Sequence, residues 1–105
     1  MMVSKPADVF HAIADENRRR LLDLLRDGER SVQDLVADMT VTVGAVSQHL
    51  KVLLESGLVT RRKEGRRRIY AVRKGALSEV HAWTNEYRQF WDDSFDRLDR
   101  YLEKG

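Results

Sequence analysis

The chain has 105 residues, no cysteine and a formal net charge of +2 at pH 7. This length suits one domain, residues 1–105, and the lack of cysteine excludes disulfides, thiolate metal sites and thiol redox chemistry. No apolar run reaches 18 residues, and the first ten residues lack the pattern of a signal peptide. We therefore expect a cytoplasmic protein with no membrane partner.

The positive charge is concentrated in one segment. Residues 59–74 contain eight Lys or Arg and a single acid, so this segment carries +7 and the rest of the chain carries −5. A basic block in an otherwise acidic chain indicates a surface that faces a polyanion. A solvated charged hairpin is the alternative interpretation.

The first half of the chain predicts helices. Ser4 and Pro6 are typical of a helix start, and Asp15 is the expected N-cap of a second helix over residues 16–26. Three arginines, residues 18–20, could reach phosphate or could neutralise the acids beside them. We favour the second, structural role because acids flank them on both sides.

Two short helices joined by a tight turn come next. Ser31 predicts the N-cap of a helix that ends near Met39, and Thr42 and Gly57 predict the start and the end of another. The apolar residues of this last helix recur at helical spacing and are expected in the core; they are Val43, Val46, Leu50 and Leu53. Its other face is small, amide-bearing or cationic. This pattern predicts a helix-turn-helix whose second helix enters a DNA major groove.

The pattern after Gly57 changes to that of a β-hairpin. Residues 58–63 and 67–72 are β-branched, aromatic or basic, and they flank Glu64 and Gly65, where glycine allows the positive φ of a tight turn. A basic hairpin after a helix-turn-helix predicts a winged helix-turn-helix. The expected fold class is mainly α with a small β-hairpin (α+β), in the order α-α-α-α-β-β-α, with the helix-turn-helix and wing in residues 6–75.

Residues 76–104 predict one long, aromatic helix. Its apolar stripe offers more surface than so small a domain can cover, which predicts a dimerisation helix. Packing of this helix onto its own domain is the alternative. The expected dimer-interface residues are Leu77, Val80, Trp83, Tyr87, Trp91, Leu98 and Tyr101.

Four segments of the chain form a recognisable set: DENRRRLLDLL at 15–25, VSQHLKVL at 46–53, ESGLV at 55–59 and EGRRRIY at 64–70. With these segments, residues 6–75 resemble the ArsR-type winged-helix transcription regulators. The aromatic C-terminal segment is similar to a cysteine-free branch of this family. The resemblance implies a homodimer that binds double-stranded operator DNA with an inverted repeat and represses transcription, and in such regulators a ligand or metal usually weakens DNA binding.

The resemblance also implies the DNA-binding positions. On the recognition helix these are Thr42, Gly44, Ala45, Ser47, Gln48 and His49, and on the wing they are Arg61, Arg62, Arg66, Arg67 and Arg68. The helix pattern itself adds Lys51, which we expect to bind phosphate.

Side-chain chemistry suggests distinct roles for these residues. Gln48 can form two hydrogen bonds to adenine, and Ser47 can donate to a base or a phosphate. Gly44 and Ala45 are small enough to let the backbone approach the groove. His49 could contact phosphate or its own scaffold. The wing arginines are expected to bind phosphate, which gives affinity rather than sequence choice.

Other classes of function have weaker support in the sequence. A metal-responsive repressor could use Glu79 and His81 with Asp92 or Asp93 and Asp96, but one histidine among acids is poor transition-metal chemistry, so we expect no metal and no cofactor. His11 has no ligand partner nearby. An enzyme is not expected, because no nucleophile, base and acid combine. A protein-interaction module that uses the aromatic helix remains open, and the identity of any small-molecule effector is unknown.

Overall fold

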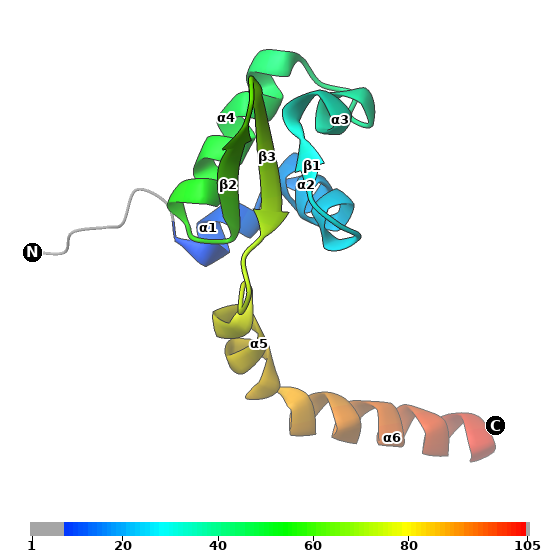
Figure 1. The fold of residues 1–105 in the computed structure, drawn as a ribbon. Helices are drawn as coiled ribbons and strands as arrows, with labels where there is room; N and C mark the ends of the chain where they lie inside the picture. Colours follow the sequence, from blue (N-terminus) through cyan, green and yellow to red (C-terminus); the bar gives the residue numbers. More distant parts are fainter. Residues whose placement is uncertain (1–7, 105) are drawn as a thin grey trace, which may run out of the picture.

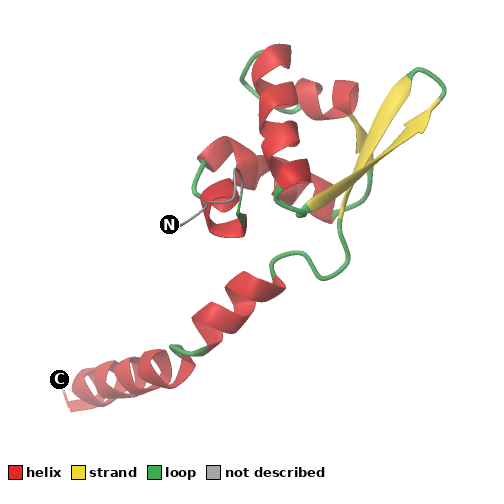
Figure 2. Ribbon diagram, turned by 90° about the vertical axis from the view of Figure 1, so that its left-hand side faces the viewer, coloured by secondary structure: helices red, strands yellow, loops and turns green. Residues whose placement is uncertain are grey.

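The computed structural model describes residues 8–104, and the side chains of these residues except 94–96, 99, 103 and 104 (Figure 1). Its elements, in chain order, are α1 (Val9–Ile13), α2 (Glu16–Arg26), β1 (Arg30–Ser31), α3 (Val32–Ala37), α4 (Val43–Glu55), β2 (Val59–Glu64), β3 (Arg67–Val72), α5 (Ser78–Asn85) and α6 (Arg88–Lys104). Helices α1 to α4 form a body beside which the β2–β3 hairpin extends (Figure 2).

Side-chain caps fix the starts of the first four helices. The predicted caps are confirmed: Asp15 accepts from the Arg18 N–H at 3.1 Å, Ser31 from Asp34 at 3.2 Å, and Thr42 from Ala45 at 3.1 Å. Each satisfies a donor that a helix start leaves without a partner. The predicted start of the first helix, at Ser4 and Pro6, lies outside the described residues, and Asp8 caps α1.

The core lies where α2, α3 and α4 meet the base of the hairpin. Its fully buried side chains include Leu21, Leu35, Val46, Leu50, Leu53 and Leu58. The prediction that Val43 lies in the core is wrong, because its side chain is 58 % exposed. It stands in the first turn of α4, where the apolar spacing continues but the core behind it has ended.

The sheet has three strands in the order β1-β3-β2, all antiparallel. The predicted hairpin is confirmed, with Val59 opposite Val72 and Glu64 opposite Arg67, and Gly65 turns with φ +63°. The predicted order α-α-α-α-β-β-α is wrong in omitting β1, which pairs Arg30 with Tyr70. A two-residue strand has no periodicity that a sequence could reveal.

The C-terminal region is two helices, so the prediction of one unbroken helix over residues 76–104 is wrong. The Thr84 hydroxyl donates to the His81 carbonyl at 3.0 Å, and the Tyr87 N–H donates to Thr84, three residues back, at 3.0 Å. Such bonds tighten and bend a helix, and they end α5. Helices α5 and α6 lead away from the body (Figure 1). Within residues 8–104, no helix is both long and apolar enough to cross a bilayer.

Candidate nucleic-acid interface

Helix α4 presents a polar stripe to solvent. Val46, Leu50 and Leu53 are fully buried, and this fixes the rotation of the helix about its axis. The residues on the other side are exposed: Gly44, Ser47, Gln48, Lys51 and Glu55. The first turn contains no acid. The stripe therefore combines small, hydrogen-bonding and cationic groups, which suit base edges and phosphates, and its one acid, Glu55, is in the last turn.

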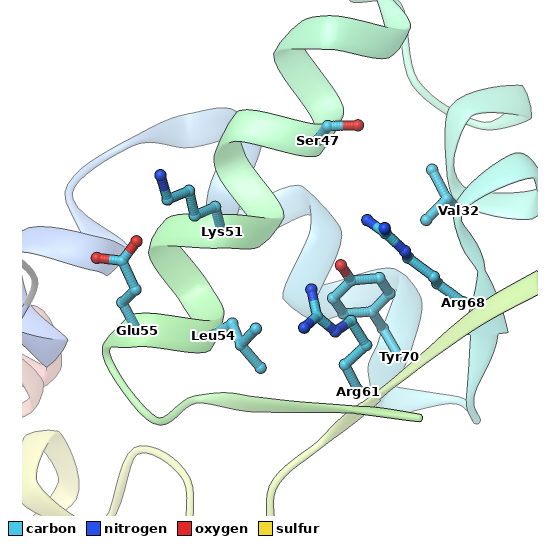
Figure 3. A pocket seen from close by; sticks show the side chains of 8 residues that line it. All are labelled: Val32, Ser47, Lys51, Leu54, Glu55, Arg61, Arg68 and Tyr70. Atoms are coloured by element: carbon cyan, nitrogen blue, oxygen red, sulfur yellow. The ribbon is translucent and has the colours of Figure 1, made fainter. Parts of the chain in front are cut away.

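The hairpin stands beside α4 and encloses a hollow of about 390 Å³ with it (Figure 3). Arg61, Arg68 and Tyr70 extend from the hairpin toward the helix (Figure 3). The remaining lining residues are Ser47, Lys51, Leu54 and Glu55 of α4 and Val32 of α3. Three of the eight lining side chains are cations and one is an acid, so the hollow favours anions.

Strand register decides which wing cations face α4. Arg61 pairs with Tyr70 and Lys63 pairs with Arg68, and cross-strand partners share a face of the sheet. Because Arg61, Arg68 and Tyr70 line the hollow, Lys63 lies on the same face. The sequence prediction omitted Lys63. The alternation of residues 61 and 63 along β2 was the signal that could have found it.

Cations on the other face of the hairpin form ion pairs with acids. Arg62 forms ion pairs with Glu29, at 2.6 Å, and with Glu64, and Arg67 lies 3.5 Å from Asp34. The hydrogen bond from Arg62 lowers the pKa of the Glu64 carboxyl. Four wing cations have no acid partner among the described side chains: Arg61, Lys63, Arg66 and Arg68.

His49 packs against the scaffold. Its side chain is 18 % exposed, its Nδ1 lies 3.3 Å from Arg18 Nη1, and its Nε2 lies 4.0 Å from Asp15 Oδ1. The guanidinium is the donor in this contact, because it has no acceptor atom. Burial alone would raise the pKa of Asp15, but the Arg18 N–H and the charges of His49 and Arg18 together lower it.

Two arginines of the triplet, Arg18 and Arg19, have a structural role, but their hydrogen-bond acceptors are carbonyls and not the acids that we expected. Arg18 donates to the carbonyls of Ala12 and His11, at 2.7 and 3.2 Å, and Arg19 donates to Ile13 at 2.7 Å. These carbonyls end α1, so the two arginines satisfy acceptors that the helix leaves open. Among the described side chains, no ion pair joins these arginines to the acids predicted as their partners.

The predicted dimer residues are largely exposed. Trp83 packs edge-to-face on Phe10, with ring centroids 5.7 Å apart, and on Tyr87, at 5.4 Å. Farther along, Trp91, Leu98 and Tyr101 are 47, 52 and 75 % exposed. Leu77 is exposed and Val80 is half-buried. Of the metal candidates, the Asp96 side chain lies outside the described part, and no three described His, Asp or Glu side chains gather as a metal site.

Comparison with known proteins identifies the family. Residues 15–61 match the family model of the arsR family of bacterial regulatory proteins. The HTH-type transcriptional regulator Rv2034 of Mycobacterium tuberculosis is 37 % identical over 86 residues, which cover 82 % of this chain and 78 % of the relative. The transcriptional repressor SdpR of Bacillus subtilis is 28 % identical over 76 residues, 72 % of this chain and 84 % of the relative.

Solved structures agree in fold. A possible transcriptional regulator for arsenical resistance superposes with a TM-score of 0.70 and 43 % identity, over 87 % of this chain and 92 % of that one. A homodimeric winged helix-turn-helix DNA-binding domain from Mycobacterium bovis has a TM-score of 0.63 and 30 % identity, over 77 % and 75 %. The chain therefore belongs to the arsR family of bacterial regulatory proteins: it is a winged-helix transcriptional regulator and not an enzyme.

Proposed function

We propose that this regulator binds an inverted-repeat operator as a homodimer, in the cytoplasm, and represses transcription. The observation that carries the proposal is the polar stripe of α4 beside a hairpin face whose cations have no acid partner among the described residues. The stripe supplies base contacts, and the hairpin supplies phosphate contacts on either side of the groove.

The residues at the DNA-facing side of α4 have different roles in this complex. Gln48 contacts adenine, Ser47 a base or a phosphate, and Lys51 a phosphate. Gly44 and Ala45 allow close approach, and Thr42 holds the start of the helix through its cap to Ala45. His49 positions α4 on the scaffold through Arg18. On the wing, Arg61, Lys63, Arg66 and Arg68 bind phosphate, whereas Arg62 and Arg67 stabilise the hairpin through their acids.

Dimerisation uses α5 and α6. The aromatic and leucine side chains of α6 that are half exposed or more in one copy would be covered in a pair, which removes apolar surface from water. The homodimeric winged-helix domain from M. bovis supports a homodimer. Two copies related by a two-fold axis would place two α4 helices in successive major grooves, about 34 Å apart.

A gel shift with DNA from upstream of the protein's own gene tests the proposal. We expect a specific complex at low salt that weakens as salt rises, because phosphate binding releases counterions. DNA of scrambled sequence is the control and should bind more weakly. A dimer that shifts neither DNA at low salt would contradict the proposal and favour a protein partner for the aromatic helices.

A further inference from the structure

The most exposed large apolar side chain of the winged-helix body, residues 8–76, is Val43, at 58 %. The other two exposed ones, Phe10 and Val72, are 38 and 36 % exposed, and Phe10 already packs on Trp83 of α5. The start of α4 and helix α3 lie at the end of the body opposite α5 (Figure 1). Val43 is therefore far from the aromatic surface that we assign to the dimer.

The surroundings of Val43 are apolar and continue the DNA-binding surface. Val43 lines an open hollow of about 300 Å³ with four residues of α3: Val32, Gln33, Val36 and Ala37. Val32 also lines the cationic hollow between α4 and the hairpin. The two hollows thus share Val32, so the apolar hollow at Val43 adjoins the cationic hollow.

The first turn of α4 lets a base edge come close. Gly44 has no Cβ, and a Cβ built there would meet only the Thr42 hydroxyl, at 4.0 Å. Ser47 lies one turn after Val43 on the same side of the helix. In helix-turn-helix proteins the first residues of this helix reach base edges. The apolar group that the major groove offers is the 5-methyl of thymine.

We propose that Val43 is a specificity-determining residue that packs on the 5-methyl group of a thymine in each operator half-site. This inference rests on the proposed function, because it needs an operator. It adds an apolar contact from the first turn to the polar contacts of Ser47 and Gln48 in the second. Burial against Val43 and the α3 hollow would favour thymine over cytosine at that position, and over any analogue without the methyl group.

The experiment removes that methyl group and no other atom. The operator is first selected in vitro with the full chain, and each thymine is then replaced, one position per half-site at a time, by uracil. Dissociation constants are measured by fluorescence anisotropy for the wild type and for V43A. We expect one position at which uracil weakens wild-type binding about fourfold per half-site, which corresponds to about 0.8 kcal/mol for one buried methyl-sized group. The same replacement should weaken binding of V43A less than binding of the wild type, because alanine buries less of the methyl group.

Two further variants make the result specific. V43I keeps an apolar side chain and should keep the dependence on the methyl group. V72A removes the same atoms from an exposed valine of β3 that lines a hollow with α2, and it should leave the wild-type uracil profile unchanged. Equal thermal unfolding of V43A and wild type shows that the fold is intact.

The outcomes separate this inference from the proposed function. Specific operator binding with the same uracil profile in wild type and V43A, or with no methyl-dependent thymine at all, overturns the role of Val43 alone. A selection that yields no operator overturns the proposed function and this inference with it.

Discussion

Nη1 of Arg18 lies 3.3 Å from Nδ1 of His49, and this contact joins α2 to the middle of α4. The same guanidinium holds the last carbonyls of α1. One side chain therefore connects the DNA-facing helix to two helices of the scaffold, which explains why a histidine within the polar segment of α4 is mostly covered.

Replacing His49 with alanine should lower the free energy of unfolding by about 1 kcal/mol, the usual net value of one such hydrogen bond. For a domain of this size the melting temperature would fall by about 4–8 °C. The salt dependence of DNA binding should not change, because His49 contacts no phosphate in our proposal. H11A is the matched control, since its exposed ring can be removed while its carbonyl still accepts from Arg18. Unchanged melting with weaker operator binding would instead place His49 on DNA.

Asp15 should make stability depend on pH. Its folded-state pKa lies below its ordinary value of 3.8, so it stabilises the fold above that value and loses this contribution as pH falls through the lowered pKa. D15N keeps a good cap but cannot ionise. Denaturant unfolding should show D15N less stable than wild type at pH 7, with the difference shrinking below about pH 4. A difference that stays constant down to pH 2 would contradict the prediction.

The two faces of the wing should respond differently to charge removal. The logarithm of the DNA-binding constant falls as the logarithm of salt concentration rises. R61Q and R68Q should each make this slope less steep by about 0.9, the value of one phosphate contact. R67Q is the matched control, because Arg67 lies on the other face beside Asp34. Titrations at several salt concentrations measure the slopes. Equal slopes for R67Q and R68Q would show that the ion pair does not keep Arg67 from DNA.

Gln48 should contribute to sequence choice more than to affinity for any DNA. Q48A should weaken operator binding by about 1–3 kcal/mol, the value of a bidentate contact to adenine, and should change binding to scrambled DNA much less. Q89A is the control, because Gln89 is exposed and lies on the side of α6 opposite Trp91 by helical spacing. A similar loss on both DNAs would mean that Gln48 contacts no base.

Charge placed on the exposed stripe of α6 should separate the dimer. W91E with L98E should give a monomer by light scattering and weak operator binding, because a buried carboxylate without a partner is costly. R100E adds the same group on the opposite side of α6 by helical spacing, and it should remain dimeric. A dimeric mass for the double variant would place the interface elsewhere.

The sequence alone determined the features that depend on neighbouring residues. The caps at Asp15, Ser31 and Thr42 each bond to a residue three positions later. The buried residues of α4 recur every three or four positions, and Gly65 adopts the positive φ that its turn needs. These signals need no tertiary information. Together with the family's motifs they predict a winged-helix regulator.

Only the tertiary structure decided the features that join distant residues. Arg62 meets Glu29, and Arg18 meets His49, across more than 30 positions of the chain, so no local pattern predicts which cations stay available for DNA. Val43 fits the apolar spacing of α4 but has no core behind it. Strand β1 is too short to show a period, and only its pairing with β3 defines it. Each of these depends on what lies next to a residue in space, and sequence periodicity carries no record of that.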